Sequence, residues 1–329
     1  MKSSNTRFKF IEHRAKQSNF YLKVKTSNFL IYIIKEGREK KIMLDTLLQL
    51  TVFSILTGGL YALIAVGLTL IFGTLQIVNF AHGEFLMLSM YCTYWLMYYF
   101  GMSPYISFFI VVPIFFLVGL AVENILIKPI IGRSFTIQIC ATLGLSLIIK
   151  YGALFAWGPG PRSIKSDFGS NILSISGIAV MYADVVIFLI SLIILILLFL
   201  FLYNTYPGKA IRAVALDRKG AELLGINVRK TYLLTFGLGI SCVAAAGVVM
   251  TPVYVCTPSV GTTFVMLAFI IVVLGGCNSM MGTLVAAFIL SFIEMFSSYF
   301  ITIHLKDAIM FGLFFIILLL RPQGLLKDR

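Results

Sequence analysis

Hydrophobic residues run through this chain in long, almost unbroken stretches, and charged residues gather in short segments between them. Asp, Glu, Lys and Arg are absent from residues 46–83, 85–122, 185–208 and 231–293. A helix that crosses a bilayer needs about 20 mostly apolar residues, so the last stretch alone has room for about three such helices. The pattern predicts a chain whose solvent is lipid.

The apolar stretches predict about nine helices, because their lengths and their turn residues fit membrane spans. We expect them near residues 47–72, 84–101, 105–127, 136–155, 180–203, 231–251, 262–275, 282–299 and 306–320. Backbone groups inside a bilayer must bond within the protein, and the stretches lack the alternation of barrel strands. The predicted fold is an all-α, polytopic transmembrane bundle of about eight or nine spanning helices, with broken or re-entrant segments near 73–84 and 275–282.

Composition agrees with this class and excludes several functions. Apolar residues make up 60% of the chain, charged residues 12%, and the mean hydropathy is +0.99. The net charge of +13 lies largely in short loops, where basic residues orient membrane proteins, so no nucleic-acid partner is expected. The cysteines form no CxxC pair, and no metal site is predicted. No phosphate-binding Gly-x-x-x-x-Gly-Lys-Ser/Thr loop occurs, so the chain is not expected to bind nucleotide or any cofactor of its own.

The distribution of basic residues predicts the orientation in the membrane. Lys and Arg outnumber Asp and Glu in the loop 204–230, and basic residues also follow the last helix. The positive-inside rule places this loop and the C-terminus in the cytoplasm.

The N-terminus does not fit that alternation, since residues 1–43 carry eleven Lys and Arg although the helix count places them outside. Either the first helix is broken at Gly58-Gly59, which changes the parity, or residues 1–42 do not belong to the native membrane protein. Residues 1–41 lack a sustained apolar period and a signal-peptide core, and Met43 stands just before the first span. We favour a basic extension over 1–42 and a membrane domain over 43–329; a cytoplasmic basic arm is the alternative.

A polar, glycine-containing segment at 73–84 separates the first two helices without a hydrophilic loop. A tight surface turn would explain it. A broken helix within the membrane is the sharper interpretation, because unwound backbone is tolerated there only where it is buried in protein or lines a watery cavity. Asn79, His82, Gly83 and Glu84 are then candidates for a translocation pathway, although Glu84 with His82 could equally be a structural lock.

A second glycine-rich interruption, at 275–282, occupies a similar place in the C-terminal half. Paired interruptions in two halves of a transporter indicate a pathway between them, which adds Gly275, Gly276, Ser279 and Gly282 to the candidates. A close helix contact through small residues is the alternative.

The loop 204–230 is long for a helix connection and predicts a short helix. Pro207 stands at its beginning, and Gly225 follows Leu224 as a natural C-cap. Its apolar positions could bury against a partner protein, or the helix could lie among lipid headgroups.

Two motifs give the chain a family resemblance. The run YALIAVGLTLIFG, from Tyr61 to Gly73, followed by NFAHGE, from Asn79 to Glu84, resembles the signature of the LivH-type branched-chain amino acid permeases. The similarity continues through the loop 204–230 and the segment 274–282 to the terminal RPQGL, and it spans about 43–325. The family usually has Gly where this chain has Cys277 or Asn278, which makes the loop there the least secure part of the resemblance.

The resemblance implies a permease subunit of an ATP-driven ABC importer in the bacterial inner membrane, with no bond chemistry of its own. It implies a second, LivM-like permease, two cytoplasmic ATPases that bind ATP and Mg, and an external substrate-binding protein as partners. The loop 204–230 would be the element that couples to the ATPase. The residues expected to carry this coupling are Arg212, Ala215, Asp217, Ala221, Leu224 and Gly225.

The solute is left open by the sequence. Branched-chain amino acids are expected, but relatives with the same core signature import urea, short amides or other amino acids. A secondary transporter or channel is the alternative class, and its hallmark, paired acids within the membrane or a ring of carbonyls, is not evident. A membrane-embedded enzyme would need a cluster such as His-Glu-x-x-His, which the sequence lacks.

Overall fold

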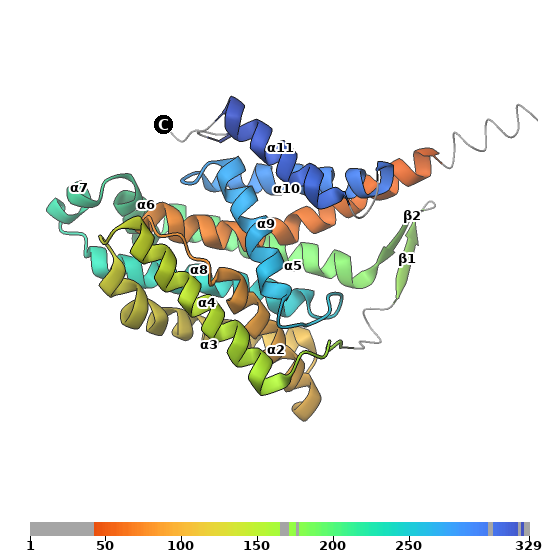
Figure 1. Ribbon diagram of the computed structural model, residues 1–329, viewed down its shortest axis with the longest axis horizontal. Coiled ribbons are helices and arrows are strands. Elements are labelled where there is room, and N and C mark those ends of the chain that lie inside the picture. The colour runs from red at the N-terminus through yellow and green to blue at the C-terminus, as the bar shows by residue number, and fades with distance from the viewer. Residues whose placement is uncertain (1–42, 165–170, 176–177, 302–304, 322–323, 326–329) are drawn as a thin grey trace, which may run out of the picture. The chain divides into compact units, whose positions relative to one another are not determined.

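The computed structural model describes residues 43–164, 171–175, 178–301, 305–321 and 324–325 (Figure 1). The predicted extension, residues 1–42, lies outside these residues. The chain divides into two units, Met1–Gln49 and Leu50–Arg329. Apart from the bounds of the first helix, which begins in the first unit, all that follows concerns the second unit.

Each apolar stretch of the sequence forms a helix, and the predicted bundle is confirmed. The first helix is Met43–Leu75. The other long helices are α2 (His82–Phe100), α3 (Pro104–Val122), α4 (Phe135–Trp157), α5 (Tyr182–Asn204), α8 (Val228–Met250), α9 (Val260–Gly275), α10 (Met280–Phe300) and α11 (Lys306–Leu320). Among the described helices, six are long and apolar enough to cross a bilayer, and α9 is a shorter apolar helix. The protein is an integral membrane protein.

Four short elements lie between the long helices: two helical turns after α3 and two strands before α5. A π-helical turn, Glu123–Ile127, and a 3-10 turn, Lys128–Ile130, extend α3. Strands β1 (Ile172–Ile175) and β2 (Ile178–Met181) pair antiparallel, with Ile172 opposite Met181. The helix expected from residue 180 therefore begins at Tyr182, because the residues before it are extended and paired in this hairpin.

The first helix is continuous, so a break at Gly58-Gly59 is the wrong explanation for the N-terminal charge. These glycines serve helix packing instead. A Cβ atom added to Gly58 would meet the ring of Phe288, and one added to Gly59 would meet the ring of Phe188. Both positions therefore leave room for aromatic side chains of neighbouring helices.

The first helix and α8 form the interior of the bundle. In the most apolar 18 residues of each helix, 83% of the residues are buried in the first helix and 78% in α8, against 11% in α4. Gly67 and Gly239 bring the two inner helices into backbone contact, since a Cβ atom added to either would lie 2.7 Å from the carbonyl oxygen of the other. Small residues let helices approach closely in lipid, where van der Waals packing drives association.

Hydrogen bonds join the first helix to α10 on its other side. The hydroxyls of Thr69 and Thr283 lie 2.7 Å apart. Ser291 Oγ donates to the carbonyl of Ser54 at 2.8 Å. Both pairs are buried, so the hydroxyls of Thr69, Thr283 and Ser291 each have a hydrogen-bond partner away from water.

The two ends of α5 distinguish the two ends of the bundle (Figure 1). The hairpin β1–β2 precedes α5, and the short helices α6 (Tyr206–Leu216) and α7 (Arg218–Leu223) follow it. We call these the hairpin end and the α6–α7 end. The turn after α3 belongs to the α6–α7 end, because Arg229, at the start of α8, donates to Asn124 at 3.3 Å.

Substitution of Gly67 by Ala is expected to destabilise the folded protein by about 1–3 kcal/mol, since the added methyl group meets the backbone of α8. Gly144→Ala is the matched control, because Gly144 lies in α4 with nothing within 4 Å of an added Cβ. Thermal unfolding in mild detergent measures both variants. Equal stability of the two would contradict close packing of the first helix on α8.

Candidate translocation and coupling sites

The loop 204–230 folds as two helices, not as the single short helix predicted. Thr205 begins α6, and its hydroxyl accepts a hydrogen bond from the Gly208 N–H at 3.2 Å. Asp217 ends α6 in an extended conformation, and its carboxylate accepts from the Lys219 N–H at 3.0 Å, which starts α7. An aspartate at this position is a strong N-cap, and it interrupts the helical run.

Gly225 ends α7 as the sequence predicted. Its φ is +80°, in the left-handed region. The Gly225 N–H donates to the Glu222 carbonyl, and the Ile226 N–H donates to the Ala221 carbonyl, each at 3.0 Å. These bonds form a Schellman motif, in which glycine has no Cβ penalty. Ala221 is buried beneath this turn.

Three leucines of this element are exposed. Leu216, Leu223 and Leu224 are 81%, 89% and 83% accessible, and we call them the leucine patch. Ile211 and Val214, on the other side of α6, are buried. Leu224 was predicted to carry coupling, and Leu223 was among the apolar positions expected to be able to bury against a partner, whereas Leu216 was missed. The available signal was an apolar residue directly followed by two charged residues, in Leu216-Asp217-Arg218.

Arg212 points from α6 back toward α5. Its Nε donates to the Leu202 carbonyl at 3.1 Å, and its guanidinium lies 4.2 Å from the centre of the Tyr203 ring. A guanidinium stacked on an aromatic ring is held both electrostatically and by packing. Arg212 therefore fastens α6 to the end of α5.

The first interruption is largely buried, with Gln76 as its exposed residue, which disfavours the interpretation as a surface turn. The helix ends at Leu75, Gln76 has a φ of +55°, and α2 begins at His82. The side chains of Asn79, His82 and Glu84 are at most 1% exposed. The interruption is tied locally, since Asn79 Oδ1 accepts from the Ala81 N–H at 3.1 Å.

His82 and Glu84 bond to different parts of the bundle. His82 Nε2 lies 3.0 Å from the Ile64 carbonyl of the first helix. Glu84 Oε1 accepts from Ser146 of α4 at 3.3 Å. Among the described residues the two side chains do not bond to each other, so a lock made by the His82–Glu84 pair is not present.

A row of polar residues on α4 faces the interruption. Thr142 Oγ1 donates to the Val78 carbonyl at 3.0 Å, and one turn later Ser146 meets Glu84. One turn further, Lys150 Nζ donates to Thr262 Oγ1 at 3.0 Å. The spacing of four residues places all three on one side of α4.

Lys150 and Glu84 form a charged cluster with Thr262 inside the bundle. Lys150 donates to Thr262, which follows Gly261 in the chain, and no direct ion pair joins Lys150 to Glu84 among the described residues. Glu84 Oε2 is buried beside Gly261 and lacks a hydrogen bond of good geometry there. Lys150 and Thr262 were absent from the predicted site, because their meeting depends on packing between distant segments.

The second interruption is held by close backbone contact. Gly275 ends α9, and its backbone touches that of Gly282 in α10. Ser279 starts α10 by accepting from the Gly282 N–H at 3.1 Å. The C-terminal segment covers the turn, since the Leu325 N–H donates to the Leu274 carbonyl at 2.8 Å.

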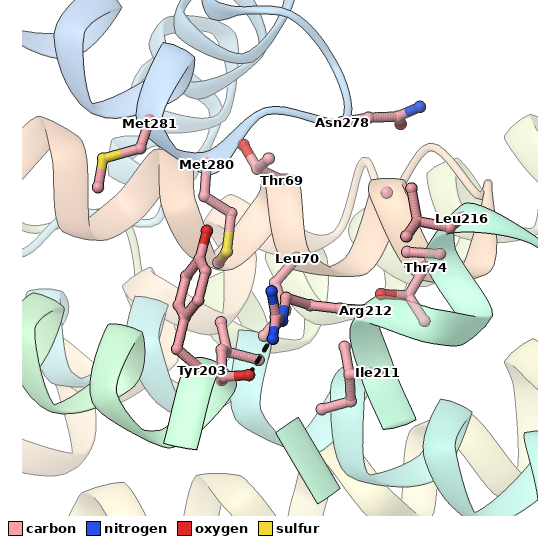
Figure 2. Close-up of a pocket in the computed structure, with 13 residues that line it drawn as sticks. Thr69, Leu70, Thr74, Tyr203, Ile211, Arg212, Leu216, Asn278, Met280 and Met281 are labelled. Carbon is pink, nitrogen blue, oxygen red and sulfur yellow. Dashed lines mark hydrogen bonds between the residues drawn. The ribbon is translucent and has the colours of Figure 1, made fainter. Parts of the chain in front are cut away.

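A pocket of about 390 Å³ lies at the α6–α7 end, and two of the predicted coupling residues, Arg212 and Ala215, line it from α6 (Figure 2). Gly73 and Thr74 contribute from the first interruption, and Asn278 contributes from the second. Figure 2 shows Arg212 in the middle of this group, with Tyr203 and Thr74 on either side. Helix α6 therefore borders the place where both interruptions meet.

The predicted pathway residues thus lie in two places. Gly276 and Ser279 belong to the second interruption, whose Asn278 lines the pocket at the α6–α7 end, whereas His82 and Glu84 lie against the first helix and α4. Gly83 links the latter group to α9, because its backbone touches that of Gly261. That all of them line one pathway stays a prediction.

A helical membrane bundle with two interrupted regions and a separate helical element at one end defines the class as membrane transport proteins. Comparison with known proteins gives the family. The family described as branched-chain amino acid transport system / permease component matches residues 50–318. The chain belongs to this family.

Two relatives represent the similarity. The chain is 29% identical over 295 residues to the high-affinity branched-chain amino acid transport system permease protein BraD of Pseudomonas aeruginosa, covering 85% of this chain and 95% of the relative. It is 30% identical over 284 residues to the corresponding protein LivH of Salmonella typhimurium, covering 82% and 92%. No solved structure matches.

The charged cluster can be tested by a double-mutant cycle on the free energy of unfolding. Lys150→Met and Glu84→Gln are each expected to destabilise the protein. The double variant should lose less free energy of unfolding than the sum of the two single variants, by about 1 kcal/mol or more. The reason is that the double variant removes both charges and leaves neither of them buried without its partner. Lys150→Met with Glu123→Gln is the control, since Glu123 lies at the α6–α7 end near Arg229 and Lys128. Additive effects in the first cycle would exclude an interaction between Lys150 and Glu84.

Proposed function

We propose that this chain is the pathway-forming permease subunit of an ATP-driven importer for branched-chain or related amino acids. The observation that carries the proposal is the contact of the α6–α7 element, through Arg212 and Ala215, with the pocket where both interruptions meet. Membership of the permease family and the names of the relatives support it.

The orientation follows from charge. The loop 204–230 carries six Lys and Arg against two acids, which supports a cytoplasmic position for the α6–α7 end and for the C-terminus. The hairpin end then faces the other side of the bacterial inner membrane.

The leucine patch fits a groove on a cytoplasmic partner, for which the proposed partner is an ATPase subunit. Exposed apolar side chains in a basic loop are costly in water and gain by burial in a complex. ATP and Mg would bind to the ATPases, of which two would serve a pair of homologous permeases, and a binding protein would deliver the solute outside.

Movement of the α6–α7 element would reach the membrane interior through Arg212. Because Arg212 is bonded to Leu202 and stacked on Tyr203, displacement of α6 also displaces the end of α5. The pocket lies between this corner and the first helix, so closure of the ATPases would change its width. Alternation between two such arrangements exposes the pathway to one side at a time.

Charge in the leucine patch should prevent association with the ATPase. Leu223→Glu with Leu224→Glu is expected to abolish co-purification of an ATP-binding subunit with the tagged chain in mild detergent, because buried unpaired carboxylates oppose the interface. Ile172→Glu is the control, since Ile172 is exposed at the hairpin end. Failure of the wild-type chain to bring down an ATPase would reject the importer.

Gly225→Trp is expected to reduce uptake of radiolabelled leucine at least about tenfold while membrane insertion is unchanged. A bulky residue in the left-handed region costs about 1–2 kcal/mol and disturbs the turn that positions Leu224. Gly101→Trp is a matched control, because Gly101 has a φ of +64° and open space around it, and it precedes α3 at the hairpin end. Normal uptake by the Gly225 variant would remove this turn from the coupling element, and uptake of urea in place of leucine would reassign the solute.

A further inference from the structure

A second cavity, of about 560 Å³, opens among the first helix, α9, α10 and α11. Its volume falls within the roughly 300–1,000 Å³ typical of small-molecule sites. Tyr254 lines it and follows the last residue of α8, the helix whose first residues lie at the α6–α7 end. The cavity therefore belongs to the hairpin end, opposite the pocket that contacts α6.

The cavity holds an acid and a base side by side. Lys306 Nζ lies 2.8 Å from Glu294 Oε1, and the side chains are 31% and 9% exposed. Tyr61 of the first helix donates its hydroxyl to Glu294 Oε2 at 2.7 Å. Glu294 is thus held on one oxygen by a fixed donor and on the other by a lysine that also reaches solvent.

An apolar wall faces these charges. Met266, Leu267 and Ile270 line the cavity from α9, and Met310 and Phe311 line it from α11. Thr262 and Thr263 add hydroxyls at the beginning of α9. The lining therefore combines the carboxylates of Glu294 and the exposed Asp307, one ammonium, hydroxyl groups and aliphatic side chains within one space.

The geometry points to a binding site for zwitterionic amino acids with aliphatic side chains in this cavity, an assignment that rests on the proposed function. The solute ammonium takes the place of Lys306 on Glu294, and Lys306 turns to the solute carboxylate. One ion pair becomes two, and the zwitterion adds no net charge to the cavity, which is the arrangement that low-dielectric surroundings favour. The aliphatic side chain lies against the wall formed by α9 and α11.

The same cavity adjoins the charged cluster deeper in the bundle. Thr262 lines the cavity, and its hydroxyl accepts from Lys150, while Glu84 Oε2 lies beside the preceding Gly261. A solute that leaves the cavity along α9 would therefore meet a second ammonium and a further carboxylate. The cavity is the outer site of a path that continues past Thr262.

Binding of radiolabelled L-leucine to the full-length chain, purified in lipid nanodiscs with the subunits that accompany it, tests the site. Leucine amide lacks the carboxylate and 4-methylpentanoic acid lacks the ammonium. Each is expected to compete at least about tenfold less well than unlabelled leucine, because each leaves one charged group of the site unpaired.

Two variants assign the charges. Glu294→Gln should weaken leucine binding about tenfold and abolish its advantage over 4-methylpentanoic acid, since the partner of the ammonium is lost. Lys306→Met should abolish the advantage of leucine over leucine amide, since the partner of the solute carboxylate is lost. A purely structural latch between α10 and α11 would lower thermal stability without changing either preference. Glu123→Gln, which removes a buried acid at the α6–α7 end, is the control and should leave both preferences unchanged.

Absence of saturable leucine binding in the wild-type chain, or unchanged preferences in both variants, would overturn the site. These outcomes are distinct from failure of the proposed function. If ATPase co-purification and leucine uptake persist while the preferences do not move, the importer stands and the site falls. If leucine binds with the expected preferences but no ATPase associates, the site stands and the importer falls.

Discussion

Close contact between helix backbones at facing glycines is the constraint on which the other features depend. Lipid gives helices little hydrophobic reason to associate, so contact area and polar bonds must hold them together. Gly67 on Gly239 seats the first helix against α8, and the contact of Gly83 with Gly261 brings Glu84 beside the start of α9. A methyl group at these positions would separate the helices, and the polar groups that meet across them would lose their partners.

The interruptions show how a membrane protein can contain irregular backbone. Residues 76–81 leave helical geometry, yet Val78 receives a hydrogen bond from Thr142 and Asn79 bonds to the turn that begins α2. Each of these groups would cost several kcal/mol if left unpaired in hydrocarbon, by the general cost of burying polar groups. The polar row on α4 therefore has a structural reason to exist, and the same row supplies the charge that lies near Glu84.

The sequence predicted the features that depend on neighbouring residues. Helix positions followed from apolar stretches, and the cap at Gly225 followed from its place after Leu224. Features that depend on distant residues were not accessible: Lys150 meets Thr262 across 112 positions, and Tyr61 meets Glu294 across 233. The division of the loop 204–230 at Asp217 was missed because a strong cap and a polar helix residue look alike until the backbone conformation is known. The hairpin at 172–181 was missed because one of its strands directly precedes a helix.

The unbroken first helix lines both cavities, with Tyr61 in one and Gly73 and Thr74 in the other. At 1.5 Å per residue, Tyr61 and Gly73 are separated by about 18 Å along one rod. Any tilt that widens the cavity at one end alters the cavity at the other. Thermodynamic linkage then requires reciprocity: the factor by which a partner at the α6–α7 end changes solute affinity is the factor by which solute changes the affinity for that partner.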